Sequence, residues 1–194
     1  MTRSKKILNI ATAIVVGLFL ACTVASFAIR AKTQPKVETA QAWEYSFTLG
    51  QDYAQVLTVP RKAVLSEIKS FFDEEGTEYT YEQYYVYVAA SSLGLFGEVY
   101  DAERVNITLF PIENYTPEDF HPETSGIYVH AGEERINVEA EEAAAYGWNP
   151  FNVSDDLVLV STGTLNYWHK IIVTELDRVE DGTRVRVEKT EKLS

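Results

Sequence analysis

The feature that most constrains this chain is an uninterrupted apolar run near its N-terminus. Residues 7–29 carry no charged side chain, and basic residues flank them on both sides. A helix of these 23 residues would be roughly 34 Å long, which is enough to cross a hydrocarbon core of about 30 Å. The run therefore predicts a single transmembrane helix over residues 7–29, inside an N-terminal membrane anchor formed by residues 1–32.

Three fates of this run are open. Besides retention as an anchor, Ser26 and Ala28 are small residues placed for signal cleavage after Ala28. Cys22 offers a site for lipidation, although bulky Phe19 and Leu20 precede it. The run is longer than the apolar segment of about 7–15 residues in a secretory signal, which favours retention.

The basic flanks also predict an orientation. Three lysines or arginines precede the run and two follow it within residues 1–32, so the rule that positive flanks stay inside places the N-terminus in the cytoplasm. We expect a single-pass, signal-anchored membrane protein whose remaining residues face the periplasmic or extracellular side.

The residues after position 32, here called the body, are strongly acidic. They hold twelve basic and 29 acidic side chains, a formal net charge of −17. Such a charge repels phosphate backbones, so we expect no nucleic-acid partner, and it attracts basic proteins. The body has no cysteine, which excludes disulfides and cysteine-ligated metals there.

Several segments of the body are predicted from their periodicity. Residues 33–42 are polar and predict a linker, and residues 43–194 predict one domain. Trp43, Tyr45, Phe47 and Leu49 alternate with polar residues, which indicates a strand that forms a hairpin with residues 53–59. The remaining expected strands are residues 79–90, 105–110, 127–130, 135–139, 157–161 and 165–177, with a final strand after a turn at Asp181 and Gly182.

One long amphipathic helix is expected over residues 61–75. Pro60 precedes it, Gly76 follows it, and apolar residues recur at spacings of three and four, which is typical of a helix with one buried face. A second, short helix is expected over residues 139–146. The predicted fold class is therefore α+β: a mostly antiparallel sheet on which the long helix packs.

No pattern in the sequence indicates catalysis. The three histidines match no metal-binding spacing, no serine lies in a nucleophile motif, and no glycine-rich loop resembles a phosphate-binding loop. The sequence therefore predicts no enzyme, no metal and no cofactor.

A proline-rich loop is the best candidate for binding contacts. Residues 111–122 hold three prolines together with Tyr115 and Phe120, and Phe151 lies in a second, shorter loop. Loops often carry binding residues, so Tyr115, Phe120 and Phe151 form a candidate interaction loop. We expect a membrane-anchored, non-catalytic accessory or interaction subunit of a larger membrane protein complex, with its acidic domain outside the cytoplasm and with protein partners. The alternative is an extracytoplasmic binding module for a lipid or another apolar small ligand.

Overall fold

A computed structural model describes residues 16, 22, 23, 34–94, 97–121, 126–131, 134–138 and 149–192. The chain divides into two compact units, Met1–Gln34 and Pro35–Ser194. The second unit, here called the folded unit, contains all the strands described below.

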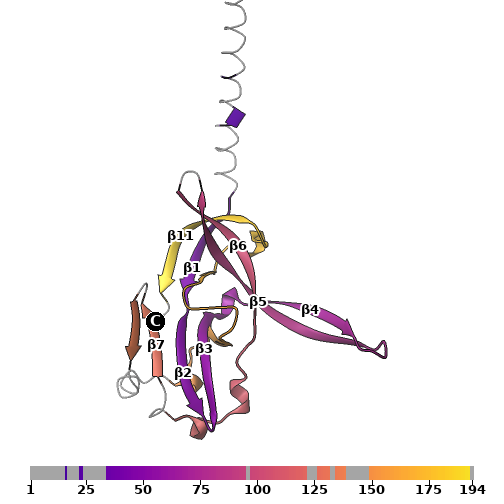
Figure 1. Ribbon diagram of the computed structural model, residues 1–194, viewed down its shortest axis with the longest axis vertical. Helices are drawn as coiled ribbons and strands as arrows, with labels where there is room; N and C mark the ends of the chain where they lie inside the picture. The colour runs from indigo at the N-terminus through magenta and orange to yellow at the C-terminus, as the bar shows by residue number, and fades with distance from the viewer. Residues whose placement is uncertain are drawn as a thin grey trace, which may run out of the picture. The chain divides into compact units, whose positions relative to one another are not determined.

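Two β-sheets make up the folded unit (Figure 1). The first sheet has the strand order β10-β1-β11-β6-β5-β4. Only the pair β1–β11 is parallel among its described pairings. Its strands are β10 (Lys170–Ile172), β1 (Lys36–Gln41), β11 (Arg184–Lys192), β6 (Gly97–Ile107), β5 (Glu78–Gly94) and β4 (Leu65–Phe72).

The second sheet is antiparallel throughout its described pairings and has the order β8-β7-β2-β3-β9. The described helices of the folded unit are 3-10 turns of three residues, such as η1 (Arg61–Ala63). The strands are β8 (Glu134–Val138), β7 (Gly126–Ala131), β2 (Trp43–Leu49), β3 (Asp52–Pro60) and β9 (Leu157–Ser161).

The main core joins the two sheets. Leu57 and Val160 from the second sheet pack with Val86, Val88 and Ile171 from the first, and each is buried. The opposite face of β2 and β3 carries Tyr45, Phe47, Leu49 and Val56, and apolar side chains from residues 110–120 and 151–153 cover it. Both faces of the second sheet are therefore packed around β2 and β3.

The first sheet ends in a projection. β4 and residues 78–85 of β5 extend away from the two packed sheets as a two-stranded ribbon (Figure 1). β6 pairs with β5 only from Tyr84 onward, so the outer part of the ribbon has no third strand in the described structure.

The expected helix over residues 61–75 is wrong, and with it the α+β class. Only Arg61–Ala63 form a 3-10 turn, and Leu65–Phe72 form β4. The apolar spacing is compatible with either element, and the aromatic strand at residues 79–85 offers β4 a full backbone partner. Gly76, expected to end a helix, has φ +83° in the hairpin turn instead.

The expected membrane helix is also overturned. Among the residues that the structure describes, no helix combines the length and the apolar character needed to cross a membrane. This finding contradicts the single-pass, signal-anchored location and the extracytoplasmic placement derived from it. Length and hydropathy show only that a helix would reach across a bilayer. Apart from Val16, Cys22 and Thr23, residues 7–29 lie outside the described residues.

Three smaller expectations have different outcomes. The polar segment predicted as a linker over residues 33–42 contains β1, whose Val37 and Thr39 are fully buried. The strand expected over residues 165–177 and the final strand do not pair across the turn at Asp181 and Gly182, because β11 pairs with β6 and β1, and Leu176–Arg178 form a 3-10 turn. The short helix expected over residues 139–146 lies outside the described residues.

Candidate interaction surface

The ribbon formed by β4 and residues 78–85, here called the arm, carries an unusual amount of exposed apolar surface. Its eight residue pairs run without interruption from Leu65 opposite Tyr85 to Phe72 opposite Glu78. Five of the eight large apolar side chains that are exposed in the described structure lie on it: Ile68 (72%), Phe72 (66%), Phe71 (53%), Tyr79 (48%) and Tyr81 (45%). Such a concentration on one element indicates a contact surface.

The arm's two faces differ because directly opposed residues of an antiparallel pair share a face. One face carries Phe71 stacked on Tyr79, with ring centroids 5.5 Å apart and planes at 19°, and Tyr81 at 6.2 Å from Phe71. The other face carries Ile68 opposite Glu82 and Phe72 opposite Glu78, with Ser70 and Thr80 between them. Apolar side chains therefore protrude on both sides of the arm.

A compact turn closes the tip. The Asp73 carboxylate accepts hydrogen bonds from the backbone N–H groups of Glu75 (3.0 Å) and Thr77 (2.8 Å). The Gly76 N–H donates to the Asp73 carbonyl at 3.1 Å. The residues that follow β4 therefore form hydrogen bonds with one another, and this turn fixes the register of the arm.

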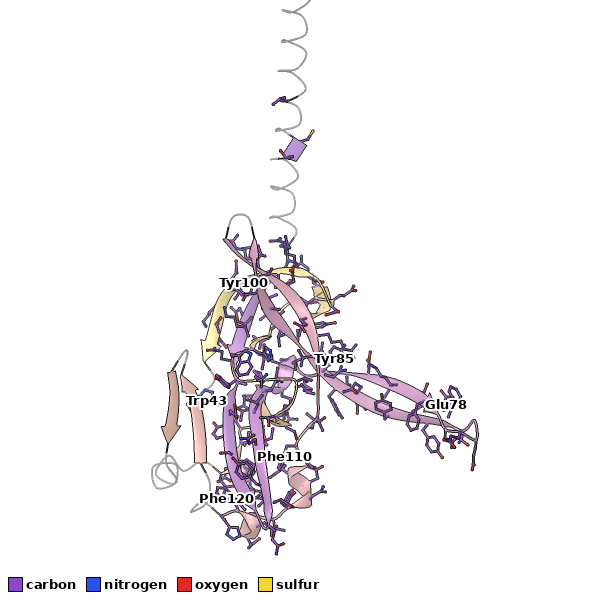
Figure 2. All side chains as sticks on the ribbon, viewed as in Figure 1. Trp43, Glu78, Tyr85, Tyr100, Phe110 and Phe120 are labelled. Carbon is purple, nitrogen blue, oxygen red and sulfur yellow. The ribbon has the colours of Figure 1, made fainter. Side chains whose placement is uncertain are left out.

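A three-residue brace holds the base of the arm. The Arg104 guanidinium, from β6, donates two hydrogen bonds to the Glu67 carboxylate of β4, one of them 3.1 Å long. It also lies over the Tyr85 ring, with its Cζ atom 3.8 Å from the centroid. Since Arg104 reaches across β5 to β4, the brace links the arm to the packed sheet. Figure 2 labels Tyr85 at the base of the arm.

The brace perturbs the Glu67 carboxyl. Hydrogen bonds from Arg104, and then from Lys69, lower the Glu67 pKa from 4.5 to about 2. A folded-state pKa below the unfolded value means that the brace contributes stability above about pH 4.5 and loses that contribution as pH falls through about 2.

We expect the acid titration of Glu67 to depend on Arg104. In the wild type, the Glu67 carboxyl carbon followed by NMR should titrate near pH 2. In Arg104→Met, which keeps an apolar stem over Tyr85, the midpoint should rise toward the ordinary value, and β4 amides should exchange faster at pH 5. Equal midpoints in the two proteins would show that the brace does not control this carboxyl.

The charge of the arm is almost all of one sign. Residues 65–84 contain six acidic side chains and one basic side chain, Lys69. Lys69 lies beside Glu67, with Nζ 3.1 Å from a carboxylate oxygen. Four of the acidic residues lie at the tip, next in sequence to the exposed aromatic residues: Asp73, Glu74, Glu75 and Glu78.

The loop residues predicted from the sequence lie in a different part of the folded unit. Tyr115, Phe120 and Phe151 are half-buried and pack against the core cluster around Phe47. Tyr115 stacks on Phe110 at 6.0 Å, and Phe120 meets the Phe47 ring edge-on at 6.3 Å. Phe110 and Phe120 are labelled beside β2 and β3 in Figure 2.

Two of these loop residues also line an open cleft. Tyr115 and Phe151 border a volume of about 430 Å³, and Phe120 does not line it. Its wall combines apolar residues with Arg61, whose guanidinium donates to the carbonyls of Asp155 (2.7 Å) and Leu157 (3.3 Å).

Within the described part of the chain, no group of three or more histidine, cysteine or acidic side chains is arranged to hold a metal ion. Of the histidines with described side chains, His169 accepts a hydrogen bond on Nδ1 from the Asn166 N–H at 2.9 Å, and burial lowers its pKa. This contact gives it a structural role in the turn before β10.

Sequence reasoning missed the arm because it assigned β4 to a helix. One signal was present: tyrosines at positions 79, 81 and 85 share a parity, and the acidic run with Gly76 before them fits a hairpin turn as well as a helix end.

The chain matches no protein-family model, and no curated protein or solved structure shows significant similarity to it.

Proposed function

We propose that this chain is a non-catalytic interaction protein that binds another protein through its arm. The observation that supports this proposal is the concentration of exposed apolar side chains on β4 and on the part of β5 that pairs with it. A two-stranded ribbon without a third strand is marginally stable in water. A protein partner that covers these side chains or extends the ribbon would stabilise it.

The arm's chemistry favours a protein over other partners. The outer edge of β4 presents backbone N–H and C=O groups, which another strand can pair with. Phosphate backbones and anionic lipid surfaces are disfavoured, because the arm carries six acidic residues against one lysine.

The alternative function, an apolar-ligand module, rested on a cavity between a curved sheet and the helix expected over residues 61–75. That segment forms β4, so no such helix closes a cavity there. The cleft beside Tyr115 and Phe151 is the observation that still favours this alternative. The cleft is weaker evidence for a binding function than the arm is, because most of the apolar residues that line the cleft also pack in the core cluster around Phe47.

The proposed function predicts that native mass depends on the arm. In extracts of the host cell, the wild-type chain should run as an assembly larger than its 21.9 kDa. The double variant Phe71→Ser with Phe72→Ser should lose that extra mass, since both side chains are exposed and their removal costs the fold little.

Tyr53→Ser is the matched control, because Tyr53 is 63% exposed but lies on β3, away from the arm. It should keep the wild-type mass. Loss of assembly in the control, or an unchanged mass in the arm variant, would contradict the proposed function.

A further inference from the structure

We propose that the partner of the arm is a second copy of this chain, bound by antiparallel pairing of the two β4 edges about a two-fold axis at Ile68. This inference rests on the proposed function, since it names the protein that the arm binds. It is carried by three observations: the open edge of β4, the distribution of side chains about Ile68, and the opposite charges of the segments before and after β4.

β4 is an unprotected edge strand. It is the last strand in the order of its sheet, and its pairing with β5 continues through eight residues with no bulge. Edge strands that avoid association usually carry a proline, a bulge or inward-pointing charges. β4 contains neither a proline nor a bulge. Its single lysine, Lys69, forms an ion pair with Glu67 two positions away.

The sequence of β4 is complementary to itself when read in both directions from Ile68. Positions equidistant from this residue pair Glu67 with Lys69, Ser66 with Ser70, and Leu65 with Phe71. In an antiparallel pair of identical strands, these are the side chains that would lie directly opposite one another on the same face. Ile68 would meet Ile68 of the second copy at the axis.

This arrangement covers the exposed apolar side chains of β4. Ile68 is 72% exposed and would pack on its own copy, while Phe71 would meet Leu65. Phe72, 66% exposed, would lie opposite Val64, which precedes β4. Each of the three therefore gains an apolar neighbour, and no charge is buried without an opposite charge facing it.

The complementarity continues beyond the strand. The same symmetry brings the acidic tip of one copy to the basic residues before β4 of the other, because Glu74 corresponds to Lys62 and Glu75 to Arg61. Lys62 and Arg61 are both exposed in η1. Lys62 carries this contact, because the Arg61 guanidinium already donates hydrogen bonds to the carbonyls of Asp155 and Leu157. The acidic tips of the two copies lie at opposite ends of the paired arms, because antiparallel arms point in opposite directions. The two tips therefore do not repel each other.

The other open edge of the arm does not share this property. Residues 78–83 of β5 lie beyond the end of β6, and their ionisable side chains are Glu78, Tyr79, Tyr81 and Glu82, none of them cationic. Self-pairing about Thr80 would place Glu78 opposite Glu82 twice, which is repulsive. The charge pattern thus selects the β4 edge over the β5 edge.

Sedimentation equilibrium of the purified full-length chain is the first test. The wild type should reach the mass of two 21.9 kDa chains. Ile68→Lys places two like charges against each other at the axis, and it should raise the dimer Kd by at least about 30-fold. Tyr53→Lys, an exposed substitution on β3, is the matched control and should leave the Kd unchanged.

Cysteine cross-linking tests the register. In a Cys22→Ser background, which removes the one native cysteine, Ile68→Cys should form an interchain disulfide. Opposed Cα atoms in a β-pair lie about 4.5–5.5 Å apart, within disulfide range. Ser66→Cys alone should not cross-link, because its copy would lie four residues away. A mixture of Ser66→Cys and Ser70→Cys chains should cross-link.

A charge exchange tests the contact between tip and base. Lys62→Glu and Glu74→Lys should each weaken the dimer, and the double variant should restore it, because the exchange keeps opposite charges facing. A chain that remains monomeric, equal cross-linking at positions 66 and 68, or a double variant weaker than both singles would overturn the proposal.

The outcome separates this inference from the proposed function. A purified monomer whose mass in host extracts still depends on Phe71 and Phe72 would retain the interaction function and exclude the second copy as partner. A purified monomer whose mass in extracts is independent of both residues would exclude the two together.

Discussion

Phe47→Ala is expected to destabilise the folded unit by about 3–5 kcal/mol. Phe47 is fully buried on β2, and its ring meets Phe110 edge-on at 5.9 Å and Phe120 at 6.3 Å. It therefore joins β2 to the two ends of the proline-rich loop, and its loss would leave a cavity that neither the sheet nor the loop can readily close.

The expected effect is measured as the shift in the urea unfolding transition of the full-length chain. Phe47→Leu keeps most of the volume and should cost less than about 1.5 kcal/mol. Tyr53→Ala, on the exposed part of the neighbouring strand, should stay within about 0.5 kcal/mol of the wild type. A loss below about 1 kcal/mol for Phe47→Ala would mean that the loop does not depend on this ring.

Alkaline pH is expected to destabilise the folded unit through Tyr45. Burial raises the pKa of the Tyr45 phenol from 10.0 to about 12, against a smaller lowering by its hydrogen bond with Thr58. The unfolded state then releases a proton near pH 10 that the folded state retains. The contribution of Tyr45 is full below pH 10 and falls as pH rises through about 12, by about 2–3 kcal/mol in total.

The free energy of unfolding measured by urea between pH 8 and pH 12 checks this effect. Tyr45→Phe should flatten the alkaline fall, although it should lower stability at pH 8 by about 0.5–1.5 kcal/mol because a buried hydrogen bond is lost. Thr58→Val removes the same hydrogen bond and keeps the phenol, so its alkaline fall should persist. A fall of equal size in wild type and Tyr45→Phe would assign the effect to other groups.

The second sheet shows which parts of the fold could be predicted from the sequence. The alternating residues of β2 predicted a strand with one buried face, and Tyr45, Phe47 and Leu49 are buried. The hairpin with β3 follows from the turn at Gly50, which adopts φ +59°. The strand expected at residues 157–161 is β9. Local alternation and turn chemistry are sufficient where a strand has one apolar face.

The first sheet shows where such reasoning fails. β1 is polar in sequence, yet it lies between β10 and β11, and its burial depends on strands whose paired residues are at least 129 positions away along the chain. β4 has apolar spacing compatible with a helix. Its conformation is decided by the backbone partner that β5 provides.

The candidate interaction residues show the same limit of prediction from local sequence. The loop residues Tyr115, Phe120 and Phe151 were chosen because they are aromatic and lie in loops, and the structure places them against the core around Phe47. Their role as an interaction loop stays a prediction. The arm was not predicted, because its exposed apolar surface exists only once β4 is a strand that leaves the packed sheets.

By itself, the sequence determined the body's acidic charge, its freedom from disulfides, the β2–β3 hairpin and the self-complementary order of residues about Ile68. These are properties of composition and of neighbours along the chain. Tertiary structure decided that residues 65–72 are an open strand edge rather than a helix face, and that β1 is buried. The physical reason is that β-pairing draws its stability from partners distant in sequence, which local periodicity does not specify.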